Sequence, residues 1–210
     1  MTGVATALLV AFGVLAVADW AATATDRQQA RYVTKPAALV ALLGVALTLD
    51  PAEPTVRAWF VAALAFSLAG DVFLLLPSDR FVEGLGAFLV AHLAYLGGLV
   101  AAGVSGGLLL VGLVVVGVAV TAIGRPLLAG VREGAPDLAV PVGAYMAVIS
   151  AMVVCAIGTG NGVAIAGAAL FYASDALIGL TRFVRAAPWA PVAVMVTYHV
   201  GQALLVLSLV

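Results

Sequence analysis

Long apolar stretches separated by short polar breaks make up almost the whole of the 210-residue chain. A helix needs about 20 apolar residues to cross a bilayer, and eight stretches approach or exceed that length. The breaks carry pairs such as Asp-Pro, Pro-Ser and Gly-Gly, and the fifth stretch ends at Arg125-Pro126. The predicted spans are residues 3–25, 33–49, 56–76, 82–101, 106–124, 138–157, 162–181 and 189–209. The pattern predicts an all-α polytopic membrane protein with eight transmembrane helices in one transmembrane domain, residues 1–210.

The composition supports a membrane protein and removes several classes of function. Hydrophobic residues make up 65% of the chain and charged residues 9%, against roughly 25% charged in soluble domains. This scarcity of charge excludes a soluble enzyme, a disordered chain and a nucleic-acid-binding protein, which would need a basic surface. The single cysteine, Cys155, excludes an internal disulfide framework.

Lysine and arginine gather at one end of the predicted spans. Only Arg57 falls at the opposite end. The positive-inside rule therefore places both termini outside and the basic connections in the cytoplasm. A cleaved signal peptide is not expected, because no basic n-region precedes the first stretch. The usage of eight Arg to one Lys, with abundant Ala and Gly, indicates a high-GC bacterium and hence its inner membrane. The residues at the basic end are Arg27, Arg31, Lys35, Arg80, Arg125, Arg132, Arg182 and Arg185.

Ionisable residues inside spans each cost about 2.5–3.5 kcal/mol on insertion scales and indicate a functional site by default. Asp71 and Asp175 are deep and have no cation within one turn on their own spans, so each is expected to be paired across helices or protonated. Asp19 and Glu83 lie near the interface, where they can snorkel, and Asp19 can also pair with Lys35. The charges form a layer near the cytoplasmic side, which favours a site open to that leaflet over an ion path.

The two halves of the chain resemble each other around these acids. In the first half Asp71 precedes Arg80-Phe81 by nine residues, and in the second Asp175 precedes Arg182-Phe183 by seven. A histidine follows each pair. The spacing predicts a parallel four-plus-four repeat with half-repeats of about 1–104 and 105–210. In such a repeat the two aspartates face one cavity across the pseudo-axis, and one of them is protonated.

At these residues the chain resembles the YhhN-type lysoplasmalogenase family of eight-span membrane proteins. The resemblance extends from about residue 32 to the end of the chain. The matching segments are Lys35-Pro36, Ser67 to Asp71 with Pro77, Phe81 to Phe88 with His92 and Tyr95, Tyr172 to Asp175 with Arg182-Phe183, and Thr197-Tyr198 with Gln202.

The resemblance implies hydrolysis of the vinyl ether bond of a lysoplasmalogen, a lysophospholipid, to a fatty aldehyde and a glycerophospho-alcohol. That chemistry needs one protonated carboxyl and one carboxylate, as in glycosidases, and Asp71 and Asp175 are the expected catalytic pair. Which of them is the acid stays open. Lys35 and Arg182 are expected to meet the phosphate at the cytoplasmic interface. The other residues expected to bind substrate are Glu83, His92, Tyr95, Tyr172, Ser174, Tyr198, His199 and Gln202.

Four alternatives compete with this interpretation. A zinc hydrolase usually has three protein ligands, whereas the chain has two histidines, each of which can equally be a packing residue, so neither a metal nor a cofactor is expected. An intramembrane aspartyl protease is disfavoured because Leu68 stands where its Gly-x-Gly-Asp motif has the first glycine. A transporter or lipid-binding protein of the same fold needs polar outer halves of its helices, which the chain lacks. The fourth alternative keeps the enzyme and exchanges the substrate for another ether lipid or lysolipid.

Overall fold

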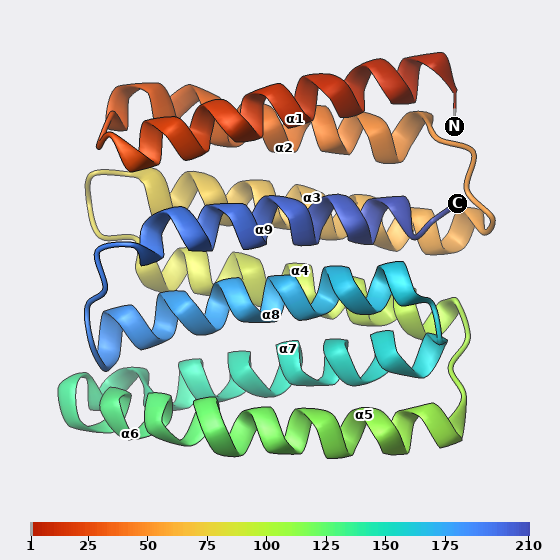
Figure 1. The fold of residues 1–210 in the computed structure, drawn as a ribbon. Coiled ribbons are helices and arrows are strands. Elements are labelled where there is room, and N and C mark those ends of the chain that lie inside the picture. The colour runs from red at the N-terminus through yellow and green to blue at the C-terminus, as the bar shows by residue number, and fades with distance from the viewer. Residues whose placement is uncertain (1) are drawn as a thin grey trace.

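The computed structural model describes residues 2–210, and within that range the chain is helical with no strand. It contains eight helical segments long and apolar enough to cross a membrane, which confirms the all-α class and the predicted number of spans (Figure 1). The elements are α1 (Gly3–Ala24), α2 (Gln28–Thr48), α3 (Pro54–Leu75), α4 (Phe81–Ala101), α5 (Gly106–Ala119), η1 (Val120–Gly124), α6 (Arg125–Gly134), η2 (Pro136–Leu138), α7 (Ala139–Thr159), α8 (Gly162–Phe183) and α9 (Ala190–Leu207).

Neighbouring helices pack into a closed ring in the order α1, α2, α3, α4, α7, α8, α9 and back to α1. The helix α5 packs against α7 and lies at the edge of the bundle (Figure 1). Aromatic rings from four helices meet in the centre of this ring. Phe60 and Tyr95 lie 4.9 Å apart between centroids, and Phe88 and Tyr198 lie 5.9 Å apart, both edge to face. Such pairs stabilise a core beyond the area that they bury.

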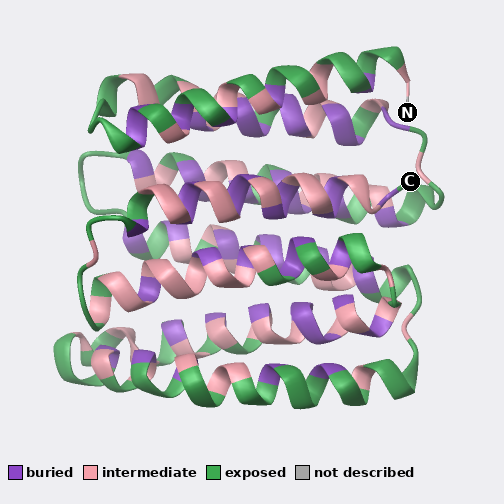
Figure 2. Ribbon diagram, in the orientation of Figure 1, coloured by how far each residue is buried: buried purple, intermediate pink, exposed green. Residues whose placement is uncertain are grey.

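The outer surface of the bundle is aliphatic. Figure 2 shows α1 and α5 largely exposed, whereas buried residues concentrate on the helices between them. Exposed side chains on α1 and α5 include Val10, Val14, Leu110 and Val114. A helix satisfies its backbone hydrogen bonds internally, so a helical bundle with an aliphatic surface is stable in lipid.

Two predicted boundaries are wrong, the start of the second span and the end of the fifth. The second span begins at Gln28, so Lys35-Pro36 lies two turns inside α2 and does not head it. The first two turns of α2 are polar because they bond to neighbouring helices, as in the hydrogen bond from Thr34 to Asp19. Arg125-Pro126 is likewise not a break, because the chain stays helical from α5 through the π-helical segment η1 into α6. Pro126 follows directly after the π-helical segment, where the changed hydrogen-bond register accommodates a residue without an N–H.

The connections α1–α2, α3–α4, α6–α7 and α8–α9 lie at one end of the bundle, on the left in Figure 1, and both termini lie at the other. The eight basic residues assigned to one side by sequence therefore do lie toward one end. The neighbour pairs α1·α2, α2·α3 and α3·α4 recur as α5·α7, α7·α8 and α8·α9. Because α1 also closes the ring against α9 while α5 lies outside the ring, the four-plus-four repeat stays a prediction.

Candidate active site

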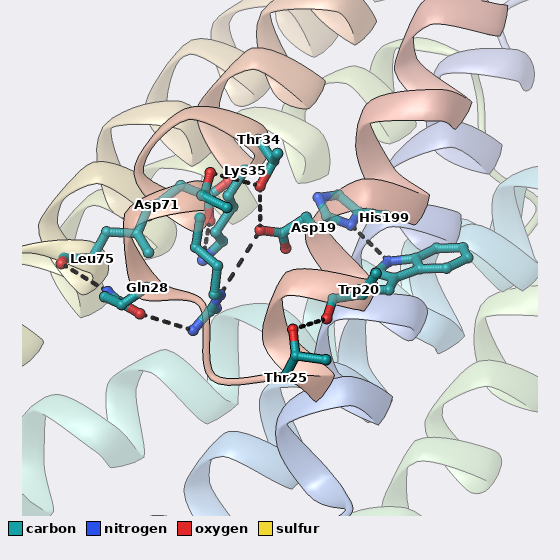
Figure 3. A network of polar contacts seen from close by, with 12 residues as sticks. Asp19, Trp20, Thr25, Gln28, Thr34, Lys35, Asp71, Leu75 and His199 are labelled. Carbon is teal, nitrogen blue, oxygen red and sulfur yellow. Dashed lines mark hydrogen bonds and ion pairs between the residues drawn. The ribbon is translucent and has the colours of Figure 1, made fainter.

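Asp71 lies in a buried ion pair between α2, α3 and α9. Its Oδ1 is 2.9 Å from the Nζ of Lys35, and its Oδ2 accepts a 2.8 Å hydrogen bond from the Tyr198 hydroxyl. All three side chains are almost fully shielded from solvent. Figure 3 shows Lys35 beside Asp71. Of the two states expected for this acid, cross-helix pairing is the one observed. Lys35 is consequently not the interfacial cation that the sequence predicted, because α2 begins five residues before the predicted residue 33.

Asp19 on α1 belongs to the same polar network. It accepts a 3.0 Å hydrogen bond from Thr34, and the Nε of Arg31 lies 3.8 Å from the same oxygen (Figure 3). The expectation that Asp19 snorkels to the interface is wrong, since its side chain is fully buried. The alternative pairing of Asp19 with Lys35 is also wrong, because the ammonium group bonds to Asp71.

Asp175 on α8 has a different environment. Its Oδ2 accepts a hydrogen bond from the Tyr145 hydroxyl of α7 and lies 3.6 Å from the Nε2 of His92 on α4. The Nδ1 of His92 lies 2.6 Å from the carbonyl oxygen of Phe88, which makes Nδ1 the N–H donor and leaves a lone pair on Nε2. Across residues 2–210, no lysine or arginine nitrogen lies within 4 Å of this carboxyl.

Two adjoining cavities bring the acids together. The smaller, with about 210 Å³ of empty space, is lined by both Asp71 and Asp175 and by Lys35, Ser174 and Tyr198. The larger, with about 700 Å³ counted out to its open side, is lined by Asp175 but otherwise mainly by hydrocarbon. Asp175 therefore stands on the shared wall, together with Leu74, Phe88 and Ile178. The expectation that both acids face one cavity is met by the smaller one.

Several other predicted residues also line these cavities. The Ser174 hydroxyl donates a 3.1 Å hydrogen bond to the Val194 carbonyl oxygen beside the smaller cavity. Tyr172 lines the larger cavity, one turn before Asp175 on α8. His92 lines neither of these two cavities, but its Nε2 lies 3.6 Å from the Asp175 carboxyl that lines both. These three residues come from α4 and α8, which lie on either side of α7 in the ring.

Four predicted residues lie elsewhere. The Tyr95 hydroxyl donates to Gln202 in the aromatic centre, and neither residue lines a cavity. His199 faces α1, where its Nδ1 accepts a 3.0 Å hydrogen bond from Trp20 (Figure 3). Glu83 is exposed and forms a 2.7 Å ion pair with Arg80 near the start of α4. The structure therefore gives these four packing or surface contacts.

Arg182 lies at the end of the larger cavity, on the surface. Its guanidinium carbon is 4.1 Å from the centroid of Phe81, a cavity-lining ring, and one nitrogen lies 2.7 Å from Asp79. The hydrogen bond from Arg182 holds the pKa of the exposed Asp79 carboxyl below its ordinary value. Asp79 is thus ionised at neutral pH and occupies one nitrogen of the guanidinium group. Another anion that binds this nitrogen has to displace Asp79.

Tyr145 is the site residue that sequence analysis missed. It lines the larger cavity and donates to Asp175. Its signal in the sequence is faint, because it is one aromatic residue in a span of small and aliphatic residues, 30 positions before its partner. The hydrogen bond from Trp20 to His199 was not predicted either, because a tryptophan near a span end is ordinarily an interface residue.

The assembled groups are suited to acid–base chemistry on an apolar molecule. One carboxyl is paired with an ammonium group, and a second carboxyl faces hydrocarbon with a phenol and an imidazole beside it. Residues 2–210 contain no group of three or more His, Cys, Asp or Glu side chains arranged to hold a metal ion.

Comparisons with known proteins show which proteins the chain resembles. The lysoplasmalogenase TMEM86B of Homo sapiens is 34% identical over 146 residues, which cover 70% of this chain and 61% of the relative. A lysoplasmalogenase of Mycobacterium bovis is 35% identical over 156 residues, covering 70% of this chain and 58% of the relative. The match thus spans about three fifths of these curated relatives. No solved structure matches significantly. The sequence profile of the YhhN family matches residues 30–209, and the chain belongs to this family.

Proposed function

We propose that this protein is a membrane lysoplasmalogenase that cleaves the vinyl ether bond of a lysoplasmalogen by carboxyl acid–base catalysis without a metal. The observation that carries the proposal is the shared wall between the two cavities, which exposes Asp175 to both a polar and an apolar space. The names of the curated relatives supply the substrate class. The larger cavity suits the hydrocarbon chain of a lysoplasmalogen, and the smaller one places Asp71 beside the same Asp175 carboxyl.

The environments of the two aspartates separate their roles. Lys35 keeps Asp71 ionised through a direct 2.9 Å ion pair, so Asp71 serves as the carboxylate. Asp175 has no such cation and faces a hydrocarbon-lined space, which favours its neutral form and makes it the acid. The lone pair on His92 Nε2 and the Tyr145 hydroxyl orient the Asp175 carboxyl group. Two carboxyls pushed to opposite states by their surroundings are the usual arrangement of acid and base.

The reaction begins with transfer of the Asp175 proton to the β-carbon of the vinyl ether. The double-bond electrons form the new C–H bond, and positive charge spreads over the α-carbon and the ether oxygen. The Asp71 carboxylate stabilises that cation across the smaller cavity. Water adds to the α-carbon and returns a proton to Asp175. The hemiacetal then breaks its C–O bond to the glycerol, which gives a fatty aldehyde and a free hydroxyl group.

The membrane orientation belongs to the same proposal. With the basic end of the bundle in the cytoplasm of a bacterial cell, the termini lie outside and the larger cavity is entered from the inner leaflet. Arg182 then stands at the lipid headgroup level. Its fork of donors suits the phosphate of a lysolipid that first meets the bundle there, which displaces Asp79.

A mass-spectrometric assay of the purified protein in detergent tests the activity. We expect release of fatty aldehyde from a lysoplasmalogen and none from the saturated alkyl ether analogue, whose β-carbon cannot accept a proton. In D₂O the aldehyde should carry deuterium on the carbon next to the carbonyl, with a rapid quench to limit later exchange. Activity should survive exhaustive chelation with EDTA.

Each alternative has its own outcome in this assay. Release of fatty acid from the acyl ester analogue, with no aldehyde from the vinyl ether, would replace the proposal by a lysophospholipase. Loss of turnover on chelation with rescue by zinc would make the mechanism metal-dependent. Tight binding of lysoplasmalogen without any product would indicate a lipid-binding or transport protein.

Reporter fusions test the orientation. We expect a reporter that is active only outside the cytoplasm to work at both termini and to fail when inserted after Asp137, in the connection before α7. The physical reason is the retention of Lys and Arg on the cytoplasmic side. Terminal fusions that work only with a cytoplasmic reporter would reverse the topology.

A further inference from the structure

The larger cavity has a wall of unusual construction. Apart from Asp175, Tyr145 and Tyr172, the residues of the described chain that line it are aliphatic, phenylalanine, methionine or glycine. One side of the wall is the π-helical segment η1, through Ile123 and Gly124. A π-helical turn inside an α-helix is rare and is often found at functional sites. Here it joins α5 to α6, which packs against α7 and α8.

Two glycines keep this cavity open. A Cβ atom on Gly124 would lie 2.8 Å from the terminal methyl of Met146, and one on Gly179 would lie 2.8 Å from a methyl of Leu127. Met146 and Leu127 also line the cavity, so larger side chains at either glycine would push hydrocarbon into it. Gly179 is one turn from Asp175 on α8, so the narrowing would occur beside the acid.

We propose that this cavity holds the hydrocarbon chain of the lysolipid and that η1 and Gly179 set the chain length that the enzyme accepts. The inference rests on the proposed function and deepens it. Hydrocarbon is the occupant because the lining offers almost no polar partner, and because Asp175 lines both this cavity and the smaller one beside Asp71. A chain lying here brings its first carbons, which form the vinyl ether, to the Asp175 carboxyl.

The test compares kcat/KM for lysoplasmalogens of increasing chain length in the wild type and in three variants. Gly124→Leu should lower kcat/KM for the longest chains by about 10-fold or more relative to short chains, since each displaced methylene is worth about 4-fold. Leu127→Ala should shift the preference toward longer chains. Gly117→Leu is the matched control, because Gly117 lies on α5 and a Cβ atom there would have no neighbour within 4 Å.

A second measurement reports occupancy without turnover. A non-hydrolysable alkyl ether lysolipid with a diazirine near the end of its chain should label peptides from α7, α8 and η1, and excess unlabelled lysolipid should suppress that label. Labelling confined to exposed faces such as α1, or an unchanged chain-length preference in Gly124→Leu and Leu127→Ala, would overturn the inference. If the wild type labels at the cavity but releases no aldehyde, the proposed function fails and the chain site stands.

Discussion

Replacing Asp175 by Asn should lower the turnover of a lysoplasmalogen by at least about 100-fold in a protein that still folds. The amide keeps the size of the carboxyl and can still accept the Tyr145 hydrogen bond, but it cannot give a proton to carbon. A positioned acid ordinarily contributes 10²–10⁴-fold, which sets the expected loss. The measurement is aldehyde release under saturating substrate, with helicity and elution volume in detergent as checks of folding.

The partner variants make this test specific. Asp71→Asn, made together with Lys35→Met so that no buried ammonium group is left unpaired, should lose a comparable factor. Adding Asp175→Asn to it should cost little more, because groups that act as a unit are not additive. Asp137→Asn is the control. Asp137 is an exposed residue in the connection before α7, and its replacement should leave the turnover of lysoplasmalogen at the wild-type value. An Asp175→Asn protein that keeps more than a tenth of the wild-type turnover would remove Asp175 from the role of acid.

Replacing Lys35 by Met should destabilise the fold strongly. The change leaves Asp71 buried without its cation, and breaking a buried ion pair in this way costs about 3–5 kcal/mol. The free energy of unfolding, measured by titration with SDS in mixed micelles, should fall by that amount. Lys35→Met combined with Asp71→Asn should recover most of the stability but none of the activity, because the buried charge is gone along with the carboxylate that we propose acts in catalysis.

An exposed pair supplies the control for this experiment. Arg80→Met breaks the solvent-exposed contact with Glu83 and should leave the unfolding transition unchanged. A Lys35→Met protein as stable as wild type, or a double variant less stable than the single one, would show that the ion pair does not hold α2 against α3.

The spans were predictable because the bilayer limits the sequence so strongly. Only a stretch of about 20 apolar residues can cross it, and the chain offers eight of them between turn-forming breaks. The start of α2 was missed because its first two turns are polar, and the sequence does not reveal that Asp19 and Asp71 lie on neighbouring helices within reach of Thr34 and Lys35. The π-helical segment was missed because Pro126 signals a break as strongly as it signals a first turn.

The residue types of the site were predictable, but their partners were not. Asp71 and Asp175 stand out as acids in apolar surroundings, and the structure places both on one cavity. Which residue bonds to each acid depends on the rotation of each helix and on its neighbours in the ring. Tyr145 reaches Asp175 from α7, and Tyr198 reaches Asp71 from α9, yet no feature of the sequence links these pairs.

The ion pair between Lys35 and Asp71 also bears on what happens after the bond is cleaved. A fatty aldehyde reacts with a neutral amine to form an imine, and Lys35 is the only lysine in the chain and lines the smaller cavity. An ammonium group held 2.9 Å from a carboxylate has no free lone pair to attack a carbonyl carbon. The other permanently charged basic side chains are eight arginines, which are far weaker nucleophiles. An enzyme that releases aldehyde here is therefore built to escape covalent modification by its own product.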